Sequence, residues 1–392
     1  MPQEHRAQRR ASQPHQRPTT TIQGPSPCGV AGLTPVMLND ATLGSDKVRP
    51  PERGLAARVH SSTLQERIRI KALVLAHRFR VIRTLDVAVA CFAERPFKAA
   101  LTAAQRAMRG MVKDELLRRY RTDRFQTIYG LTGRGVDWLE RRDIEASASV
   151  RRVSDMSNPE HRLWAQFLTL GCEVRGLTAH TEQELMLLLS EAKGGEQGRA
   201  QGLLSVSVQM NRGVKKLQLR PDAVAVESDG VTWFEVDRSA RGPDRAASLK
   251  ALVLAMGRQT RLGAPLRRVI VLTRTQRIEN RVRAALDALV RDSGKFSLME
   301  GRRVVVPCGP GAYEVVHTEE EWLPDGRTQL VDAPVGHVIV QPLPVWLPKY
   351  RLDGRDGHAC EGWFDENYLP YQRLPEMRPW PVPTSPLLLP RD

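Results

Sequence analysis

Two apolar runs with a turn signal between them form the clearest pattern in the chain. Residues 217–226 and 231–236 are rich in aliphatic and aromatic side chains and have the length of β-strands. The dipeptide Asp229-Gly230 lies between them and is a strong signal for a two-residue hairpin turn. The pattern therefore predicts an antiparallel hairpin, and the residues after it predict a helix over 243–258.

A turn at that dipeptide determines which residues face each other across the hairpin. It predicts that Val224 lies opposite Glu235 and that Asp222 lies opposite Asp237. Paired residues share one face of a sheet, and so do residues two apart on one strand. Asp222, Glu235 and Asp237 are therefore expected to converge at one end of one face. Carboxylates this close repel one another, and their hard oxygens suit a Mg²⁺ or Mn²⁺ ion that relieves the repulsion.

Helical periodicity dominates the region before residue 150. Apolar spacing predicts helices from Leu64, from Thr84 and over residues 98–117, then two short strands around Thr122-Asp123 and a closing helix capped by Thr132. Three helices, a small hairpin and a final helix are the element order of a winged helix-turn-helix domain, which we predict over residues 61–145. The string YGLTGRG is similar to the end of the wing in many winged-helix proteins.

The pattern after residue 155 mixes helices and strands. It predicts helices over 158–171, from Thr181 and over 276–290, with strands over 173–177, 268–273 and 303–306. With the hairpin, these elements predict an α/β (α+β) domain over residues 155–308. Residues 309–392 are rich in Pro and Trp, and we expect a Pro-punctuated extension with a strand near 337–341. Residues 1–60 predict a disordered basic tail, and a basic arm along DNA is the alternative.

The charge of the chain favours a polyanionic partner. Its 392 residues include 59 Lys and Arg against 44 Asp and Glu, which gives a formal net charge of +15. Residues 61–152 contain 20 basic and 10 acidic residues, so 20 minus 10 leaves +10 in under a quarter of the length. Double-stranded DNA is the partner that this charge and a winged helix predict together. A solvated basic face on a protein-binding domain is the alternative.

Candidate DNA contacts lie on the third predicted helix and on the wing. They are Lys98, Arg106, Arg109 and Lys113 on the helix and Arg118, Arg119, Arg121 and Arg124 on the wing. We expect these side chains to contact phosphates and to position the protein while the helix enters the major groove.

Several classes of protein are disfavoured by missing patterns. No apolar run approaches the about 20 residues that cross a bilayer, and the N-terminus lacks the apolar core of a signal peptide. We therefore expect no membrane partner and a cytoplasmic location. The five cysteines have no zinc-ligand or disulfide-framework spacing, which predicts reduced thiols. The chain has no phosphate-loop motif and no histidine cluster of the kind that holds a metal.

The element order around the hairpin resembles the core of PD-(D/E)xK nucleases. Pro221-Asp222 stands on one hairpin strand and Glu235-Val-Asp237 on the next, as in that motif. The resemblance implies that Asp222 and Glu235 hold a metal ion. The third position is usually lysine in these enzymes, and here it is Asp237.

The same resemblance implies roles for residues outside the hairpin. Lys250, on the next predicted helix, is a candidate to replace the missing lysine. Glu160 matches an acidic residue that many members carry in the first helix. Arg238 is a candidate for neutralising phosphate charge.

A narrower resemblance covers residues from about 65 to 295. A winged helix followed by RPDA, WFEVDRSARG and a lysine is similar to the replication-relaxation family, which includes the C-class plasmid mobilisation relaxases. Those proteins carry E-x-D where other nucleases carry E-x-K, so Asp237 fits this family. The resemblance implies metal-dependent nicking of one DNA strand at a plasmid or integrative-element transfer origin.

Two other functions fit the same residues. The missing lysine at position 237 allows a non-catalytic DNA-binding protein that positions another enzyme. An endonuclease subunit of a heteromeric transposase would also combine the two domains. A relaxase would have other mobilisation proteins as further partners. An endonuclease subunit of a transposase would have other transposition proteins as partners. A surface hairpin with solvated acids is the structural alternative for the acidic trio, and Trp233 and Phe234 argue against it because they indicate burial.

Overall fold

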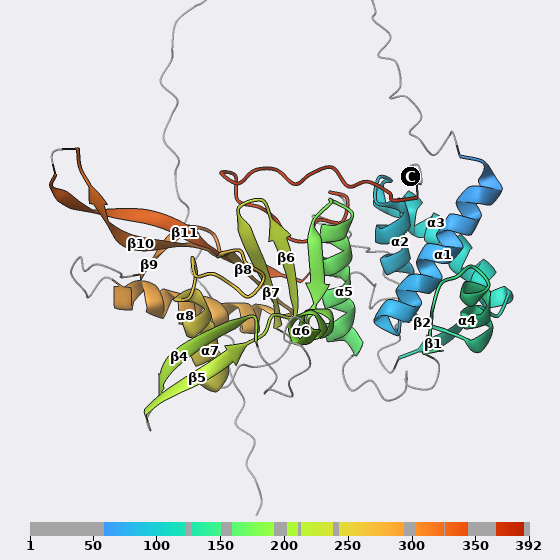
Figure 1. Cartoon of the computed structure of the whole chain (residues 1–392), viewed down its shortest axis with the longest axis horizontal. Helices are drawn as coiled ribbons and strands as arrows, with labels where there is room; N and C mark the ends of the chain where they lie inside the picture. The colour runs from blue at the N-terminus through green and yellow to red at the C-terminus, as the bar shows by residue number, and fades with distance from the viewer. Residues whose placement is uncertain are drawn as a thin grey trace, which may run out of the picture. The chain divides into compact units, whose positions relative to one another are not determined.

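The computed structural model of the chain describes nine ranges of residues. They are 59–122, 127–149, 159–191, 202–210, 213–237, 243–293, 303–324, 326–343 and 366–387. The predicted tail lies outside them except for its last two residues, and so do Arg124 and Arg238. Within these ranges the structure is mixed α/β, with helices α1–α8 and strands β1–β11 (Figure 1).

The N-terminal described part has the predicted order of elements. It consists of α1 (Ser61–Phe79), α2 (Thr84–Phe92), α3 (Phe97–Lys113), β1 (Leu117–Arg121), β2 (Thr127–Leu131) and α4 (Gly133–Glu140). Strands β1 and β2 pair antiparallel, with Leu117 opposite Leu131. The predicted cap of α4 is confirmed, because Thr132 Oγ1 accepts a hydrogen bond from Gly135 N–H at 2.9 Å.

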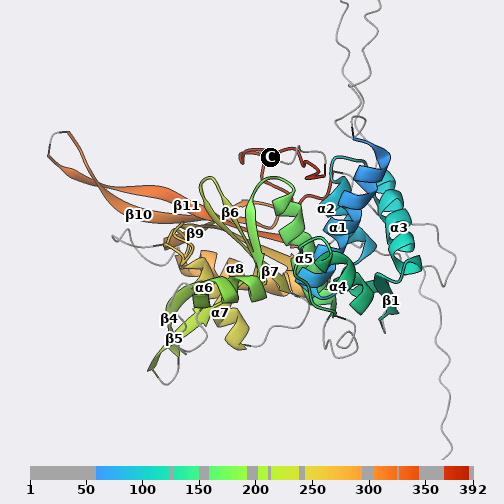
Figure 2. The same ribbon diagram turned by 45° about the vertical axis from the view of Figure 1, so that its right-hand side comes forward.

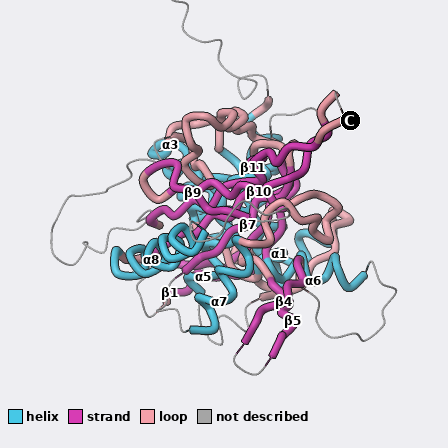
Figure 3. The backbone as a smooth tube through the Cα atoms, turned by 90° about the vertical axis from the view of Figure 1, so that its left-hand side faces the viewer, coloured by secondary structure: helices cyan, strands magenta, loops and turns pink. Residues whose placement is uncertain are grey.

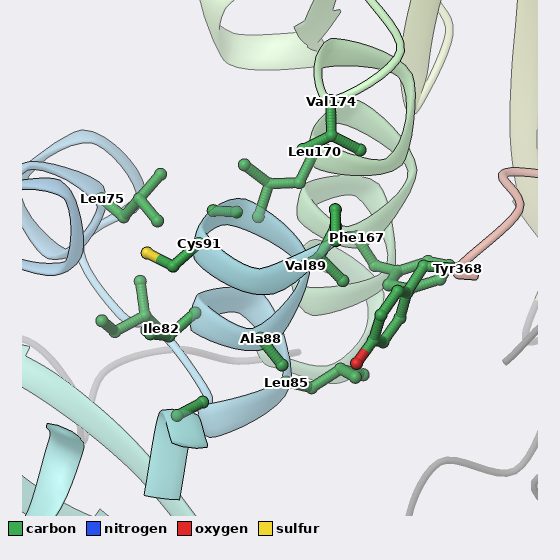
Figure 4. Close-up of a cluster of buried hydrophobic side chains, with 14 of the residues drawn as sticks. Leu75, Ile82, Leu85, Ala88, Val89, Cys91, Phe167, Leu170, Val174 and Tyr368 are labelled. Carbon is green, nitrogen blue, oxygen red and sulfur yellow. The ribbon is translucent and has the colours of Figure 1, made fainter. Parts of the chain in front are cut away.

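Helix α2 is buried on every side. All its residues from Leu85 to Phe92 are buried, and all of them except Asp86 are apolar, so the helix needs cover on all sides. Helices α1 and α3 contact it, and so does α5 (Pro159–Glu173). Figure 4 shows Val89 of α2 facing Phe167 of α5, with Tyr368 from the C-terminal end packed beside them. One hydrophobic core therefore joins the N-terminal helices to the sheet.

The main sheet has seven strands. Their order across the sheet is β3 (Thr178–Thr181), β6 (Ala223–Glu227), β7 (Gly230–Asp237), β8 (Leu266–Thr273), β11 (Thr328–Pro342), β10 (Ala312–Trp322) and β9 (Arg303–Gly309). Strands β7, β8 and β11 run parallel, and the other neighbours pair antiparallel. Strands β10 and β11 extend as a long hairpin beyond the rest of the sheet (Figures 1 and 2).

Alternate residues of the central strands enter two cores. Phe234 and Ile270 belong to the core that includes α5 and the C-terminal tyrosines. Trp233 and Val271 belong to the core that includes α7 (Pro243–Val253) and α8 (Gln276–Ser293). The near-continuous apolar sequence of β7 and β8 follows from this cover on both faces.

The strand predicted over residues 217–226 is in fact two strands of different sheets. Strand β5 (Gly213–Leu219) pairs with β4 (Leu204–Met210) in a separate two-stranded sheet, which points away from the main one in Figure 3. The chain then passes through Pro221 before β6 begins. Proline has no N–H for a ladder hydrogen bond, which explains a break at this point.

The predicted strand over residues 173–177 is also wrong. Helix α5 continues to Glu173, the chain turns at Gly176 with φ of 78°, and β3 starts at Thr178. A glycine just past a helix accepts the left-handed conformation that ends it. Helix α6 (Glu182–Glu191) follows directly, as predicted from Thr181.

The sheet continues well past residue 308, where the α/β domain was predicted to end. Strand β11 lies between β8 and β10, so two strands from the predicted extension are part of the main sheet. Residues 366–387 then pack on it without regular helix or strand. Tyr368 and Tyr371 are fully buried, and Thr384 N–H donates to Val174 O at 2.8 Å. None of the helices in the described ranges is long and apolar enough to cross a membrane.

Candidate functional site

Asp222 and Glu235 lie beside each other where β6 begins and β7 ends. The main-chain N–H of Asp222 donates to Phe234 O at 3.0 Å, and Val236 N–H donates to Asp222 Oδ2 at 2.6 Å. These bonds continue the β6–β7 pairing, in which Ala223 is opposite Phe234, by one more residue. The structure therefore brings the two acidic residues together at the carboxyl end of β7.

The hairpin turn differs from the prediction. Glu227 pairs with Gly230, so Ser228 and Asp229 form the turn in place of Asp229-Gly230. Gly230 has φ of 147°, and a Cβ on it would lie 2.4 Å from Pro265 O. The glycine is therefore explained by the close approach of a neighbouring chain segment at the start of β7.

This difference moves the pairing by two residues and leaves the faces unchanged. Asp222 lies opposite Glu235 instead of opposite Asp237. Because side chains alternate with a period of two, a shift of two residues keeps the acidic residues on one face. Asp237 is the last residue of β7 and pairs with Thr273, and its side chain lies outside the described part of the structure.

A histidine that the sequence analysis did not single out contacts this pair. His161 Nε2 lies 3.0 Å from Asp222 Oδ1, and the two side chains are 29% and 17% exposed. Helix α5 begins at Pro159, so His161 stands in its first turn. The signal that could have found it is its neighbour Glu160, which the resemblance to PD-(D/E)xK nucleases implies as a site residue and whose side chain lies outside the described part.

Glu235 is held in place by its own strand. Trp233 Nε1 donates a hydrogen bond to Glu235 Oε1 at 2.8 Å, and the indole is 1% exposed. Val236, on the other side of Glu235 in sequence, is buried as well. A buried donor fixes the orientation of the carboxylate, as hydrogen bonds to the ligands of metal sites do, and so prepares it to bind a ligand. The surface hairpin with solvated acids is thus excluded for Glu235, which is only partly exposed.

This group offers carboxylate oxygens and an imidazole, although its ligand atoms are not among those of the described residues that gather within 4.8 Å of one another. Asp222 and Glu235 supply carboxylate oxygens, and His161 supplies an imidazole that orients Asp222. The group lies at the carboxyl ends of the parallel strands β7 and β8, the edge where open α/β sheets bind ligands. A Mg²⁺ or Mn²⁺ ion prefers oxygen donors of this type.

Lys250, the candidate for the missing lysine, pairs with a residue outside the acidic group. Its Nζ is 3.4 Å from Asp292 Oδ2 of α8, and the two side chains are 52% and 50% exposed. The structure therefore pairs the lysine of α7 with the neighbouring helix and does not join it to the acidic pair.

The basic residues predicted on α3 are all exposed. The inner face of the helix consists of the buried residues Phe97, Ala100, Ala104, Met108 and Met111. The exposed positions include Lys98, Arg106, Arg109 and Lys113. Arg118, Arg119 and Arg121 of β1 are exposed too. Helix α3 contains no acidic residue, so these charges form a basic face.

The acidic residues that follow α3 have partners of their own. Asp114 Oδ2 accepts a hydrogen bond from Arg69 Nη2 at 2.6 Å, and Glu115 Oε2 accepts one from Arg134 Nη1 at 3.0 Å. Their charges are therefore offset by these partners and do not cancel the basic residues of α3.

The chain was compared with known proteins in three ways. A scan against protein-family models, a search of curated proteins and a search of solved structures each found no match.

Proposed function

We propose that this chain is a DNA-binding protein that nicks one strand of a plasmid or integrative element with the help of a divalent metal ion. In this proposal α1–α4 with the β1–β2 hairpin are a winged helix that reads DNA. The sheet with α5, α7 and α8 is a PD-(D/E)xK-like nuclease core. The observation that carries the proposal is the position of Asp222, which lies beside Glu235 and contacts His161.

The chemistry follows from what these residues can do to a phosphodiester. Asp222 and Glu235 would hold the ion, which when bound would polarise the phosphate and acidify a water molecule. His161 is placed to hold Asp222 in one orientation, and an imidazole next to a carboxylate can also accept a proton. Cleavage of one strand then requires that DNA be positioned by the basic face of α3.

The test of the nuclease site is nicking of supercoiled DNA that carries the element's own transfer origin. We expect open-circle product with Mg²⁺ or Mn²⁺ and none with a chelator. Asp222→Asn and Glu235→Gln should each lower the nicking rate by at least about 100-fold, the scale of losing one group that stabilises transition-state charge. Asn is preferred to Ala at position 222, because its side-chain oxygen can still accept the Val236 N–H.

A matched control separates the site from general charge effects. Glu320→Gln removes one exposed carboxylate from β10 of the same sheet and should nick like the wild type. If Asp222→Asn and Glu235→Gln also nick like the wild type, the acidic pair is not the nuclease site.

DNA binding is tested separately from cleavage. Arg106→Gln and Arg109→Gln should each weaken binding and reduce the slope of log K against log salt by about 1, as expected when a phosphate contact is lost. Arg291→Gln, an exposed position on α8, is the control and should leave the slope unchanged. Equal slopes in all variants would refute DNA binding by α3.

A non-catalytic DNA-binding protein is the second candidate. The observation that favours it is the ion pair of Lys250 with Asp292, because the acidic pair then lacks the lysine typical of these nucleases. Calorimetric titration with Mn²⁺ distinguishes the two. A catalytic site should bind Mn²⁺ and lose that binding in Asp222→Asn, whereas an inactive scaffold should show no difference between the two proteins.

A further inference from the structure

A second group of metal-binding side chains lies on the opposite face of the sheet. Cys308 of β9, His337 of β11 and Glu376 of the C-terminal segment each offer one ligand atom, and these atoms all lie within 4.8 Å of one another. Three separate segments of the chain thus converge here. This group is independent of the proposed nuclease function.

The fold presents each of these residues for a structural reason. In the pairing of β9 with β10, Gly309 lies opposite Ala312 and Pro307 lies opposite Tyr313. Cys308, between them, is therefore the extra residue of a bulge. Bulges re-aim side chains and are frequent next to functional sites. His337 is held between strands, because it pairs with Glu314 of β10 and with Arg268 of β8. Its Nε2 lies 3.6 Å from Glu314 Oε1.

The C-terminal segment delivers Glu376 from a fixed position. The side chain of Gln341 of β11 forms two hydrogen bonds with the main chain of Gln372 in this segment. Gln341 Nε2 donates to Gln372 O at 2.7 Å, and Gln372 N–H donates to Gln341 Oε1 at 3.0 Å. Arg373 forms an ion pair with the buried carboxylate of Glu227 and stacks 3.8 Å from the centre of the Trp380 ring. Glu376 therefore lies in a stretch that is anchored on both sides.

The local charge suits a cation. The carboxylates of Glu314 and Glu376 both lie near the imidazole of His337, since Glu314 Oε1 is 3.6 Å from His337 Nε2 and Glu376 offers one of the ligand atoms within 4.8 Å. A divalent cation would relieve the repulsion between the two carboxylates.

The donor types decide which cation fits. A thiolate and an imidazole favour Zn²⁺ over Mg²⁺ or Mn²⁺, and a carboxylate is a common third zinc ligand. In tetrahedral zinc sites the ligand atoms are about 3.2 to 3.9 Å apart, so small side-chain rotations from the observed positions suffice. Histidine ligands in such sites are usually oriented by a carboxylate, which Glu314 provides.

We propose that Cys308, His337 and Glu376 bind one Zn²⁺ ion, with Glu314 orienting the imidazole, and that this ion fastens the C-terminal segment to the edge of the sheet. The bound ion closes a loop between β11 and the segment, and clips of this kind stabilise a fold by restricting the unfolded chain.

The test uses the full chain with any affinity tag removed. After exhaustive dialysis, metal analysis should find one Zn²⁺ per chain, and Co²⁺ in its place should give the absorption band of a thiolate–cobalt bond. Cys308→Ser should abolish that band and weaken Zn²⁺ binding by at least about ten-fold, and His337→Gln and Glu376→Gln should weaken binding similarly. Zn²⁺ should raise the midpoint of thermal unfolding of the wild type, and it should raise that of the three variants by less at the same concentration.

Two controls make the result specific. Glu320→Gln removes an exposed carboxylate of β10, and Asp222→Asn alters the other acidic site. Both should keep the cobalt band and the zinc affinity. Absence of zinc binding in the wild type, or a cobalt band that survives in Cys308→Ser, would overturn the proposal. Glu376 is exposed, so Glu376→Gln remains folded and informative even if another variant fails to fold.

Discussion

The ion pair of Arg83 and Asp86 at the start of α2 gives the sharpest prediction about stability. Asp86 is 0% exposed and Arg83 is 4% exposed. Asp86 accepts hydrogen bonds from Arg83 N at 2.7 Å, from its Nε at 3.1 Å and from its Nη2 at 2.6 Å. The guanidinium also donates to Leu163 O, so the pair ties α2 to α5.

Removal of only one member of this pair should be costly. Asp86→Ala deletes the acceptor of three hydrogen bonds and leaves a positive charge in a buried position. Breaking a buried pair in this way typically costs about 3 to 5 kcal/mol, because the remaining charge has no compensation. Replacement of both members, as in Arg83→Met with Asp86→Leu, removes the charges together and should recover most of that loss.

Equilibrium unfolding in urea, followed by circular dichroism, measures these differences. Glu115→Gln is the control, since Glu115 and Arg134 form an exposed pair with side chains 74% and 67% exposed. Such pairs contribute less than about 1 kcal/mol. A loss of under about 1 kcal/mol in Asp86→Ala, or a double variant less stable than Asp86→Ala, would refute the reasoning that burial sets the cost.

Two further predictions concern pH and backbone conformation. Burial raises the pKa of Glu184, but the hydrogen bonds and charge of Arg78 outweigh it, so the folded pKa is lowered. Wild type should therefore be more stable than Glu184→Gln at neutral pH, and the difference should vanish as the pH falls below the usual titration range of a glutamate and through the lowered folded pKa; a difference that persists in urea titrations at acid pH would contradict this. Gly336 has φ of 155°, and a Cβ there would lie 2.1 Å from Arg267 O, so Gly336→Ala should lower the thermal midpoint. Gly110→Ala, in the last turn of α3 where a Cβ would meet nothing within 4 Å, should raise or preserve it, and a loss of stability in both variants would refute the steric argument.

Much of the N-terminal fold could be predicted because its signals are local. Helical periodicity, Pro96 before α3 and the Thr132 cap all act within a few residues of the chain. The sequence of α2 is apolar from Val87 to Phe92 and predicts a buried helix, although it does not say that α5 is what covers it.

The sheet was harder to predict because its order depends on distant pairings. Strand β11 enters between β8 and β10, and nothing near residue 337 in the sequence specifies those neighbours. The same holds for residues 366–387, whose Pro-rich pattern predicts extended chain, whereas Tyr368 and Tyr371 are fully buried. An irregular segment can still be part of a core when its aromatic side chains bury large apolar areas.

The candidate site was predictable only where one hairpin contains it. Asp222 and Glu235 are joined by a local turn, so an error of two residues in register left them on the same face. His161 reaches the site from another element, α5, and no spacing rule in the sequence connects it to Asp222. Cysteine spacing could not point to the group around Cys308 for the same reason, because its neighbours His337 and Glu376 are on β11 and in the C-terminal segment.

The two proposed metal groups lie at opposite ends of the parallel strands and on opposite faces of the sheet. Glu235 shares a face with Trp233 and pairs with Val271, which lies near the carboxyl end of β8. His337 pairs with Arg268, which lies near the amino end of β8, and its side chain is on the opposite face of the sheet from Glu235. Their donors also differ, since one group has hard oxygens and the other a thiolate with an imidazole. A chelator that removes all metals would therefore abolish nicking and loosen the C-terminal segment together. Only Asp222→Asn and Cys308→Ser, assayed in parallel for nicking and for thermal unfolding with Zn²⁺, can show that the two effects are separate.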